Sequence, residues 1–269
     1  MSLNYLKNIF KVLKWPILYG VGQFVIIVIF TLLFNIGLQM TSEQLSLYMK
    51  TAEYQNHLAQ FLADNQFFIV FIPAIIFLPI FVMIYNKHKV NTKIKLNAKN
   101  YLLFSILGLS ICFIFNIIVK NINDIVYFTD VFSKSIIHLN IFINILCVGI
   151  IGPIMEEYLF RGIIYNKIKT FNTNKNAVIL TSLLFAFMHN NYVHIIYAFL
   201  LSLLLIYVYE KYKTLKAPIM IHLVANTCNI IFLDLIIGNM LIINILLLIV
   251  MSIILGLGLK QIQKCNYNN

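Results

Sequence analysis

Charged side chains are scarce in this chain of 269 residues, because Asp, Glu, Lys and Arg together make up only 11% of it and the acidic residues number 9. Hydrophobic residues reach 61%, and the mean hydropathy is +0.89. A water-soluble domain of this length needs far more polar surface, so that class is excluded. Intrinsic disorder is excluded as well, because it requires low hydrophobicity and high charge.

Cysteine is also rare, with four residues and no pair at C-x-x-C spacing. Cys112, Cys147 and Cys228 fall inside apolar runs, which argues against a disulfide framework. The 20 Lys and Arg residues are scattered in small clusters instead of forming one basic patch. This distribution argues against a nucleic-acid partner.

What the sequence has in abundance is long apolar runs, several of them above the roughly 18 residues that mark a bilayer-spanning helix. The chain is therefore predicted to be an all-α, polytopic membrane protein, a single integral membrane domain over residues 1–269. We expect about eight transmembrane helices, near residues 16–38, 67–85, 101–119, 137–166, 176–190, 193–209, 217–237 and 240–259.

The orientation follows from the positive charges between these helices. Counted from the N-terminus, the odd-numbered segments hold 17 Lys and Arg residues and the even-numbered ones hold 3. Because cytoplasmic loops retain positive charge, both termini are expected in the cytoplasm. The richness in Ile, Asn and Lys is typical of an AT-rich bacterium, which indicates a bacterial plasma membrane. Tyr207 and Tyr209, beside Glu210, resemble an interfacial aromatic belt.

The fourth run contains an ionisable cluster, and ionisable groups inside hydrocarbon point to function by default. Glu157 and Arg161 are four residues apart, so they share a helix face in the order that favours an ion pair. Glu156 points about 100° away and is free of that partner, which suits a general base. The alternative is a helix end that surfaces in the cytoplasm, since basic residues follow at Lys167 and Lys169.

Two further runs carry polar residues. The fifth run ends in His189, and the seventh opens with His222 and Asn226, which share one helix face. A lone intramembrane His is often a hydrogen-bonded packing residue, but two His, one Asn and two Glu are harder to explain by packing. The helical rise places them in the inner half or middle of a core about 30 Å thick. We expect a buried site between the fourth, fifth and seventh helices.

The three polar groups also carry a family resemblance. In order along separate membrane helices the sequence reads Glu156-Glu157-x-x-x-Arg161, Phe185-x-x-x-His189 and His222-x-x-x-Asn226. This set resembles the motifs of the CPBP family, the CAAX-protease and bacteriocin-processing (Abi) intramembrane proteases, which include the type II CAAX prenyl endopeptidases. The resemblance covers a catalytic core of about residues 140–235, and the family implies eight helices.

The resemblance implies hydrolysis of a peptide bond within or beside the bilayer. Glu156 with His189 would activate the attacking water, and His222 with Asn226 would stabilise the oxyanion of the tetrahedral intermediate. In a supporting role, Glu157 and Arg161 would hold the helix and Phe185 would pack against the site.

Family members have been described as metalloproteases, so a zinc-dependent mechanism is an alternative to the metal-free one. Glu156, His189 and His222 would then be three ligands with an open fourth position. The sequence contains no His-Glu-x-x-His pair, and the metal-free mechanism uses the same three residues. The metal-free route, with no cofactor, is therefore favoured.

Two other classes of function remain as alternatives. A proton-coupled transporter would use the same intramembrane residues, but it predicts paired broken helices, and the Gly152-Pro153 interruption has no counterpart in the N-terminal half. A catalytically silent membrane scaffold would have no need of the complete motif set. The expected partners are membrane lipids and a hydrophobic or membrane-anchored peptide or protein, in bacterial maturation of a bacteriocin or signalling peptide or in self-immunity.

Overall fold

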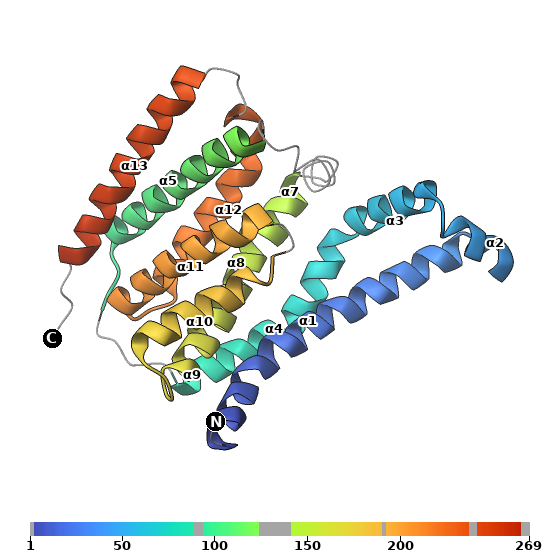
Figure 1. The fold of residues 1–269 in the computed structure, drawn as a ribbon, viewed down its shortest axis with the longest axis horizontal. Helices are drawn as coiled ribbons and strands as arrows, with labels where there is room; N and C mark the ends of the chain where they lie inside the picture. The colour runs from blue at the N-terminus through green and yellow to red at the C-terminus, as the bar shows by residue number, and fades with distance from the viewer. Residues whose placement is uncertain (1–2, 89–93, 124–140, 190–191, 237–240, 265–269) are drawn as a thin grey trace.

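The computed structural model describes residues 3–88, 94–123, 141–189, 192–236 and 241–264, and every regular element in these ranges is a helix (Figure 1). Among the described residues, six helices are long and apolar enough to cross a membrane. These spans are Lys7–Gly37, Phe67–Lys87, Ala98–Ile118, Ile141–Ile168, Tyr192–Tyr212 and Ile242–Lys264. The prediction of an all-α polytopic membrane protein is confirmed.

The long helices are α1 (Leu3–Gly37), α4 (Gln66–His88), α5 (Ala98–Asn123), α11 (Tyr192–Tyr212), α12 (Lys216–Ile236) and α13 (Leu241–Lys264). The predicted fifth span corresponds to α10 (Asn174–Ala186), whose 13 residues rise only about 20 Å. The start of the predicted fourth span and the end of the fifth lie outside the described residues. The count of eight transmembrane helices stays a prediction.

The fourth span is one continuous helical path whose hydrogen-bonding pattern changes along its length. It runs through α7 (Ile141–Asn144), the π-helix η1 (Ile145–Ile151), α8 (Gly152–Glu157), the π-helix η2 (Tyr158–Tyr165) and α9 (Asn166–Ile168). Pro153 lies in the first turn of α8, where a missing N–H is tolerated, so the helix continues through the expected interruption. Wide π-turns are frequent at functional sites.

Between α1 and α4, two short helices occupy the segment that the sequence places outside the membrane. Helix α2 (Ser42–Tyr48) begins with a reciprocal capping box between Thr41 and Gln44. Helix α3 (Ala52–Asp64) is tied to α1, because the hydroxyl of Tyr54 donates to Asn35 Oδ1 at 2.9 Å. Figure 1 shows both helices at the end of the α1–α4 arm, opposite to the first turn of α1 and the last turn of α13.

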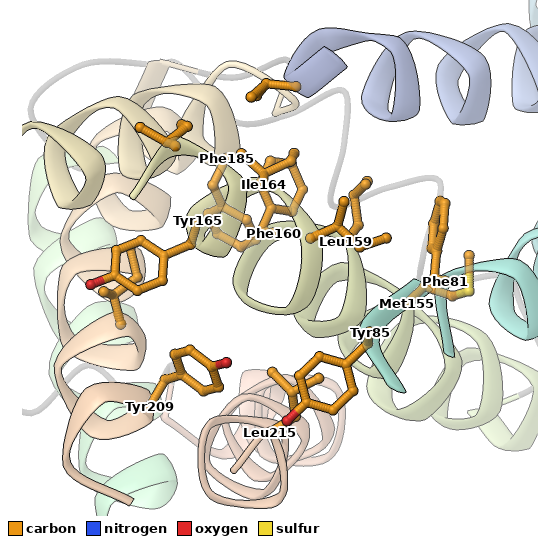
Figure 2. Close-up of a cluster of buried hydrophobic side chains, with 14 of the residues drawn as sticks. Phe81, Tyr85, Met155, Leu159, Phe160, Ile164, Tyr165, Phe185, Tyr209 and Leu215 are labelled. Atoms are coloured by element: carbon orange, nitrogen blue, oxygen red, sulfur yellow. The ribbon is translucent and has the colours of Figure 1, made fainter. Parts of the chain in front are cut away.

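Two apolar clusters hold the helices together. The first lies around η2 and joins α4 and α10 to it, and Figure 2 shows Phe160, Ile164 and Phe185 gathered there, with Phe81 beside Met155. The second joins α5 to α11, α12 and α13. Gly108 of α5 lets α12 approach closely, since a Cβ at this position would lie 2.6 Å from the carbonyl oxygen of Ile221.

The end of the fourth span is held by one amide. Asn166 Nδ2 donates to the hydroxyl of Tyr209 at 2.8 Å and to the carbonyl oxygens of Arg161 and Gly162 at 3.1 and 3.0 Å. Tyr209 is buried, so its assignment to an interfacial belt is wrong. It faces the bundle because it serves as the partner of Asn166, which the sequence alone does not reveal.

Gly108→Ala is expected to destabilise the protein, because backbone atoms of α12 cannot move aside for the new methyl group. Overpacking of this kind costs about 1–3 kcal/mol. Thermal unfolding in detergent micelles should show a lower midpoint for Gly108→Ala. Gly256→Ala is the matched control, since a Cβ on Gly256 would meet nothing within 4 Å. Equal midpoints for the two variants would contradict the close packing of α5 on α12.

Candidate active site

A buried carboxylate joins two of the helices that carry the motifs. Oε1 of Glu157, the last residue of α8, accepts a hydrogen bond from Arg161 Nη1 at 2.9 Å. The same oxygen lies 2.9 Å from His222 Nδ1 on α12. The side chains of Glu157 and Arg161 are fully buried, and His222 is 3% exposed. Charges buried this deeply persist only when they are paired and hydrogen-bonded.

The two glutamates lie on either side of one imidazole. Glu157 faces Nδ1 of His222, whereas Glu156 Oε2 lies 3.7 Å from Nε2. Glu156 is also the more open of the two, with 32% of its side chain exposed. A carboxylate that accepts from Arg161 is ionised and can only accept, so Nδ1 of His222 carries a hydrogen. Nε2 is then the nitrogen that His222 presents to Glu156.

Spacing in the sequence predicts the Glu157–Arg161 pair, and the structure contains it. Sequence analysis placed Glu156 and His222 in one buried site but paired Glu156 with His189, so the direct approach of Glu156 to Nε2 of His222 is new. No spacing rule could have shown it, since Glu156 and His222 lie on different helices whose relative rotation the sequence does not encode.

The aromatic ring of Phe185, near the end of α10, lies among the polar residues. The guanidinium carbon of Arg161 is 4.5 Å from the ring centroid, a cation–π geometry. The ring centroids of His189 and His222 lie at 5.3 and 5.9 Å. Phe160 of η2 packs edge-on at 5.0 Å (Figure 2). Phe185 therefore contacts both histidines, and it is itself buried.

His189 follows α10 and is fixed by the backbone of that helix. Its Nδ1 lies 3.1 Å from the carbonyl oxygen of Phe185. A carbonyl only accepts, so Nδ1 is the donor and the neutral ring presents an unprotonated Nε2 on its other side. The side chain is partly buried.

Asn226 lies one turn beyond His222 on α12 and contacts η1. Its Nδ2 donates to the carbonyl oxygen of Val148 at 3.2 Å, and the neighbouring Thr227 donates to that of Gly149 at 3.4 Å. A Cβ on Gly149 would lie 2.7 Å from the hydroxyl of Thr227, so the close approach requires glycine there. Sequence analysis missed Thr227, although its place next to Asn226 gave a weak indication.

The zinc alternative requires three ligands around one point. Within the part of the chain that the structure describes, no three His, Cys, Asp or Glu side chains form such a group. The Nδ1 contacts of His222 and His189, to a carboxylate and to a carbonyl oxygen, would leave Nε2 of either ring able to bind a metal. Glu156, His189 and His222 are nevertheless not gathered around one point among the described residues, so no catalytic step is assigned to a metal.

Removing one partner of the buried ion pair is expected to be strongly destabilising, because the other charge remains without compensation. Glu157→Gln and Arg161→Met should each lower the free energy of unfolding by about 3–5 kcal/mol. The double variant should lose clearly less than the two single losses combined. Thermal unfolding of the four proteins in micelles measures this coupling.

The pair between Glu210 and Lys213 is the control, because it is partly exposed, with 30% and 39% of the side chains accessible. Its coupling should stay below about 1 kcal/mol. Strictly additive losses at Glu157 and Arg161 would contradict the buried pair.

The family model described as "Type II CAAX prenyl endopeptidase Rce1-like" matches residues 138–228. The membrane-embedded CAAX protease MroQ of Staphylococcus aureus is 30% identical over 184 residues, which cover 61% of this chain and 74% of MroQ.

Two further relatives match shorter segments. The UPF0177 protein YajF of Lactococcus lactis is 41% identical over 69 residues, 25% of this chain and 33% of YajF. YdiL of Bacillus subtilis is 29% identical over 79 residues, 29% of this chain and 32% of YdiL. No solved structure matches.

The segment matched by the family model includes both glutamates, Arg161, both histidines and Asn226. The relationship to MroQ extends over most of the length of that protein. The chain thus belongs to the CPBP family of CAAX-type membrane proteases.

Proposed function

We propose that this protein is a glutamate-dependent intramembrane endopeptidase with its catalytic core in residues 140–235. The observation that carries the proposal is the unequal environment of the two glutamates around His222. Glu157 is buried and ion-paired, whereas Glu156 is partly exposed and lies beside Nε2 of the ring. A carboxylate that water can reach, next to fixed donors, is suited to activate a water molecule.

In this mechanism Glu156 accepts the proton of the attacking water. His189 orients that water, because its Nδ1 donates to the Phe185 carbonyl and its unprotonated Nε2 accepts from a water O–H. The hydroxide attacks the carbonyl carbon of the substrate and forms a C–O bond. When the tetrahedral intermediate collapses, the C–N bond breaks and the proton held by Glu156 passes to the leaving amine nitrogen, so the step uses one water and no cofactor.

In this mechanism His222 and Asn226 stabilise the oxyanion of the tetrahedral intermediate. Since Nδ1 of His222 donates to Glu157, His222 donates from Nε2 only as imidazolium, with Glu156 close enough to balance that charge. Asn226 has one amide hydrogen on the carbonyl of Val148 and a second to offer. Two donors on successive turns of α12 meet the requirement for stabilising developing negative charge.

The remaining motif residues support these groups. Arg161 neutralises Glu157, and Glu157 in turn fixes the orientation of the His222 ring. Phe185 keeps both imidazoles in place by a tilted and an edge-on ring contact. The substrate is a hydrophobic or membrane-anchored peptide or protein in a bacterial plasma membrane, and maturation of a bacteriocin or signalling peptide, or self-immunity, is the setting that fits it.

The catalytic variants give the decisive test. Purified protein in liposomes is mixed with the membrane peptides of its host, and new peptide termini are identified by mass spectrometry. Glu156→Gln and His189→Ala should lower the cleavage rate about 10²–10⁴-fold, because the first removes the general base and the second removes the group that orients the water for it. His222→Ala should lower it about 10²–10³-fold through loss of an oxyanion donor. A zinc chelator should leave the wild-type rate unchanged.

Glu210→Gln is the matched control, since Glu210 pairs with Lys169 and Lys213 outside the site and should leave cleavage unchanged. An absence of new termini from wild-type protein would favour a scaffold or transporter. Loss of activity with chelator and its return with zinc would make Glu156 and the histidines metal ligands.

We also propose that both termini lie in the cytoplasm. The first turn of α1 and the last turn of α13 lie on the same side of the bundle (Figure 1), as the charge asymmetry predicts. Single cysteines placed in a cysteine-free variant near Lys7 and Lys264 should resist a membrane-impermeant maleimide in intact cells. A cysteine at Ser46 in α2 should react. The reverse pattern would overturn the orientation.

A further inference from the structure

Three lysines share one exposed stripe in the first turns of α1. Lys7, Lys11 and Lys14 are four and three residues apart, so they point in nearly the same direction, and all three are exposed. The opposite face of the same turns is buried, with Val12 only 3% exposed and packed in the apolar cluster around η2. The three ammonium groups therefore face away from the protein.

The stripe changes character directly after Lys14. Its next position is Leu18, which is 47% exposed, and it continues through Val21, Val25 and Leu32, which are exposed as well. In a helix long and apolar enough to cross a membrane, such a face lies against lipid chains. The lysines thus lie where the hydrocarbon ends and the polar headgroups begin.

The single tryptophan of the chain lies at this boundary. Trp15 packs edge-on against Phe81 of α4, with the ring centroids 6.2 Å apart. The ammonium nitrogen of Lys14 lies 4.4 Å from the centroid of the Trp15 ring, which is a cation–π contact. Tryptophan prefers the headgroup level of a bilayer, so this contact places the ammonium group of Lys14 at the depth of the lipid phosphates.

Within the described parts of the chain, no carboxylate pairs with these three lysines. Helix α1 contains no acidic residue, since the first one in the sequence is Glu43. By contrast, Lys169 and Lys213 both pair with Glu210. Like charges one helical turn apart repel each other, so the stripe is stabilised by an anion from outside the protein.

We propose that Lys7, Lys11 and Lys14 form a binding site for the phosphate groups of anionic phospholipids. A lysine at this depth keeps its methylene groups along apolar surface and extends its ammonium group to the headgroups. Lipid is favoured over an acidic protein partner, because the basic stripe continues directly into the lipid-facing surface of α1. Bound phosphate holds these turns at a fixed depth, with Val12 against η2. The site goes beyond the proposed cleavage reaction and does not depend on it.

Trp15 makes this site measurable. The purified protein is reconstituted in bilayers of phosphatidylcholine and phosphatidylglycerol, in which one lipid or the other carries bromine atoms that quench tryptophan fluorescence. The two quenching curves give the preference of the surroundings of Trp15 for the anionic lipid. Wild type should prefer phosphatidylglycerol about fivefold, the effect of one lysine near an anionic headgroup. Salt at 1 M should reduce this preference, because the Debye length falls to about 3 Å.

The variant that combines Lys11→Gln with Lys14→Gln should bring this ratio close to one, whereas arginine at both positions should retain the preference. Lys260→Gln with Lys264→Gln is the matched control. These two lysines are also exposed and one turn apart, but they lie on α13, at the other edge of the bundle from α1 (Figure 1). This control removes the same charge and should leave the ratio at Trp15 unchanged.

A wild-type ratio near one would overturn the lipid site. Equal ratios in the Lys11/Lys14 and Lys260/Lys264 glutamine variants would overturn it too, because the preference would then not come from the stripe on α1. The measurement uses no peptide substrate, so its result is separate from that of the Glu156→Gln cleavage test.

Discussion

The buried carboxylate of Glu157 is the constraint on which the geometry of the site depends. One of its oxygens accepts from Arg161 on its own helical path and from His222 on another helix, both at 2.9 Å. In a membrane interior no water replaces a missing partner, so these three groups must stay together. Their contact sets the rotation of α12 against α8. Glu156, the preceding residue, is thereby placed at the other nitrogen of the same ring.

The π-helices on both sides of α8 explain how side-chain hydrogen bonds hold the fourth span in place. A π-turn displaces carbonyl oxygens from the regular α-helical pattern, and such carbonyls need other donors. Asn226 and Thr227 of α12 supply them on η1, whereas at the end of η2 the donor is Asn166 of the span itself. The residues that anchor the helix are thus side-chain amides and a hydroxyl, which favour a defined rotation more than apolar packing does.

The sequence predicts the parts of this structure that depend on local spacing. The four-residue interval between Glu157 and Arg161 predicts their pair, and apolar run lengths predict an all-α membrane protein. The contact between Glu156 and His222 could not be predicted, because no local rule fixes how two helices face each other. Tyr209 shows the same limit, since a tyrosine near a membrane boundary looks interfacial until its partner, Asn166, is located.

Adjacent glutamates also show how position on a helix separates chemical roles. Successive residues differ by about 100° in direction, so a Glu-Glu pair cannot point both carboxylates at the same partner. Here one side chain is fully buried and compensated by Arg161, and the other is 32% exposed beside His222. The paired carboxylate cannot give up its charge without leaving Arg161 uncompensated, whereas the exposed one can exchange a proton with water. The dipeptide therefore contains a structural anion and, under the proposed function, the carboxylate that acts as the base.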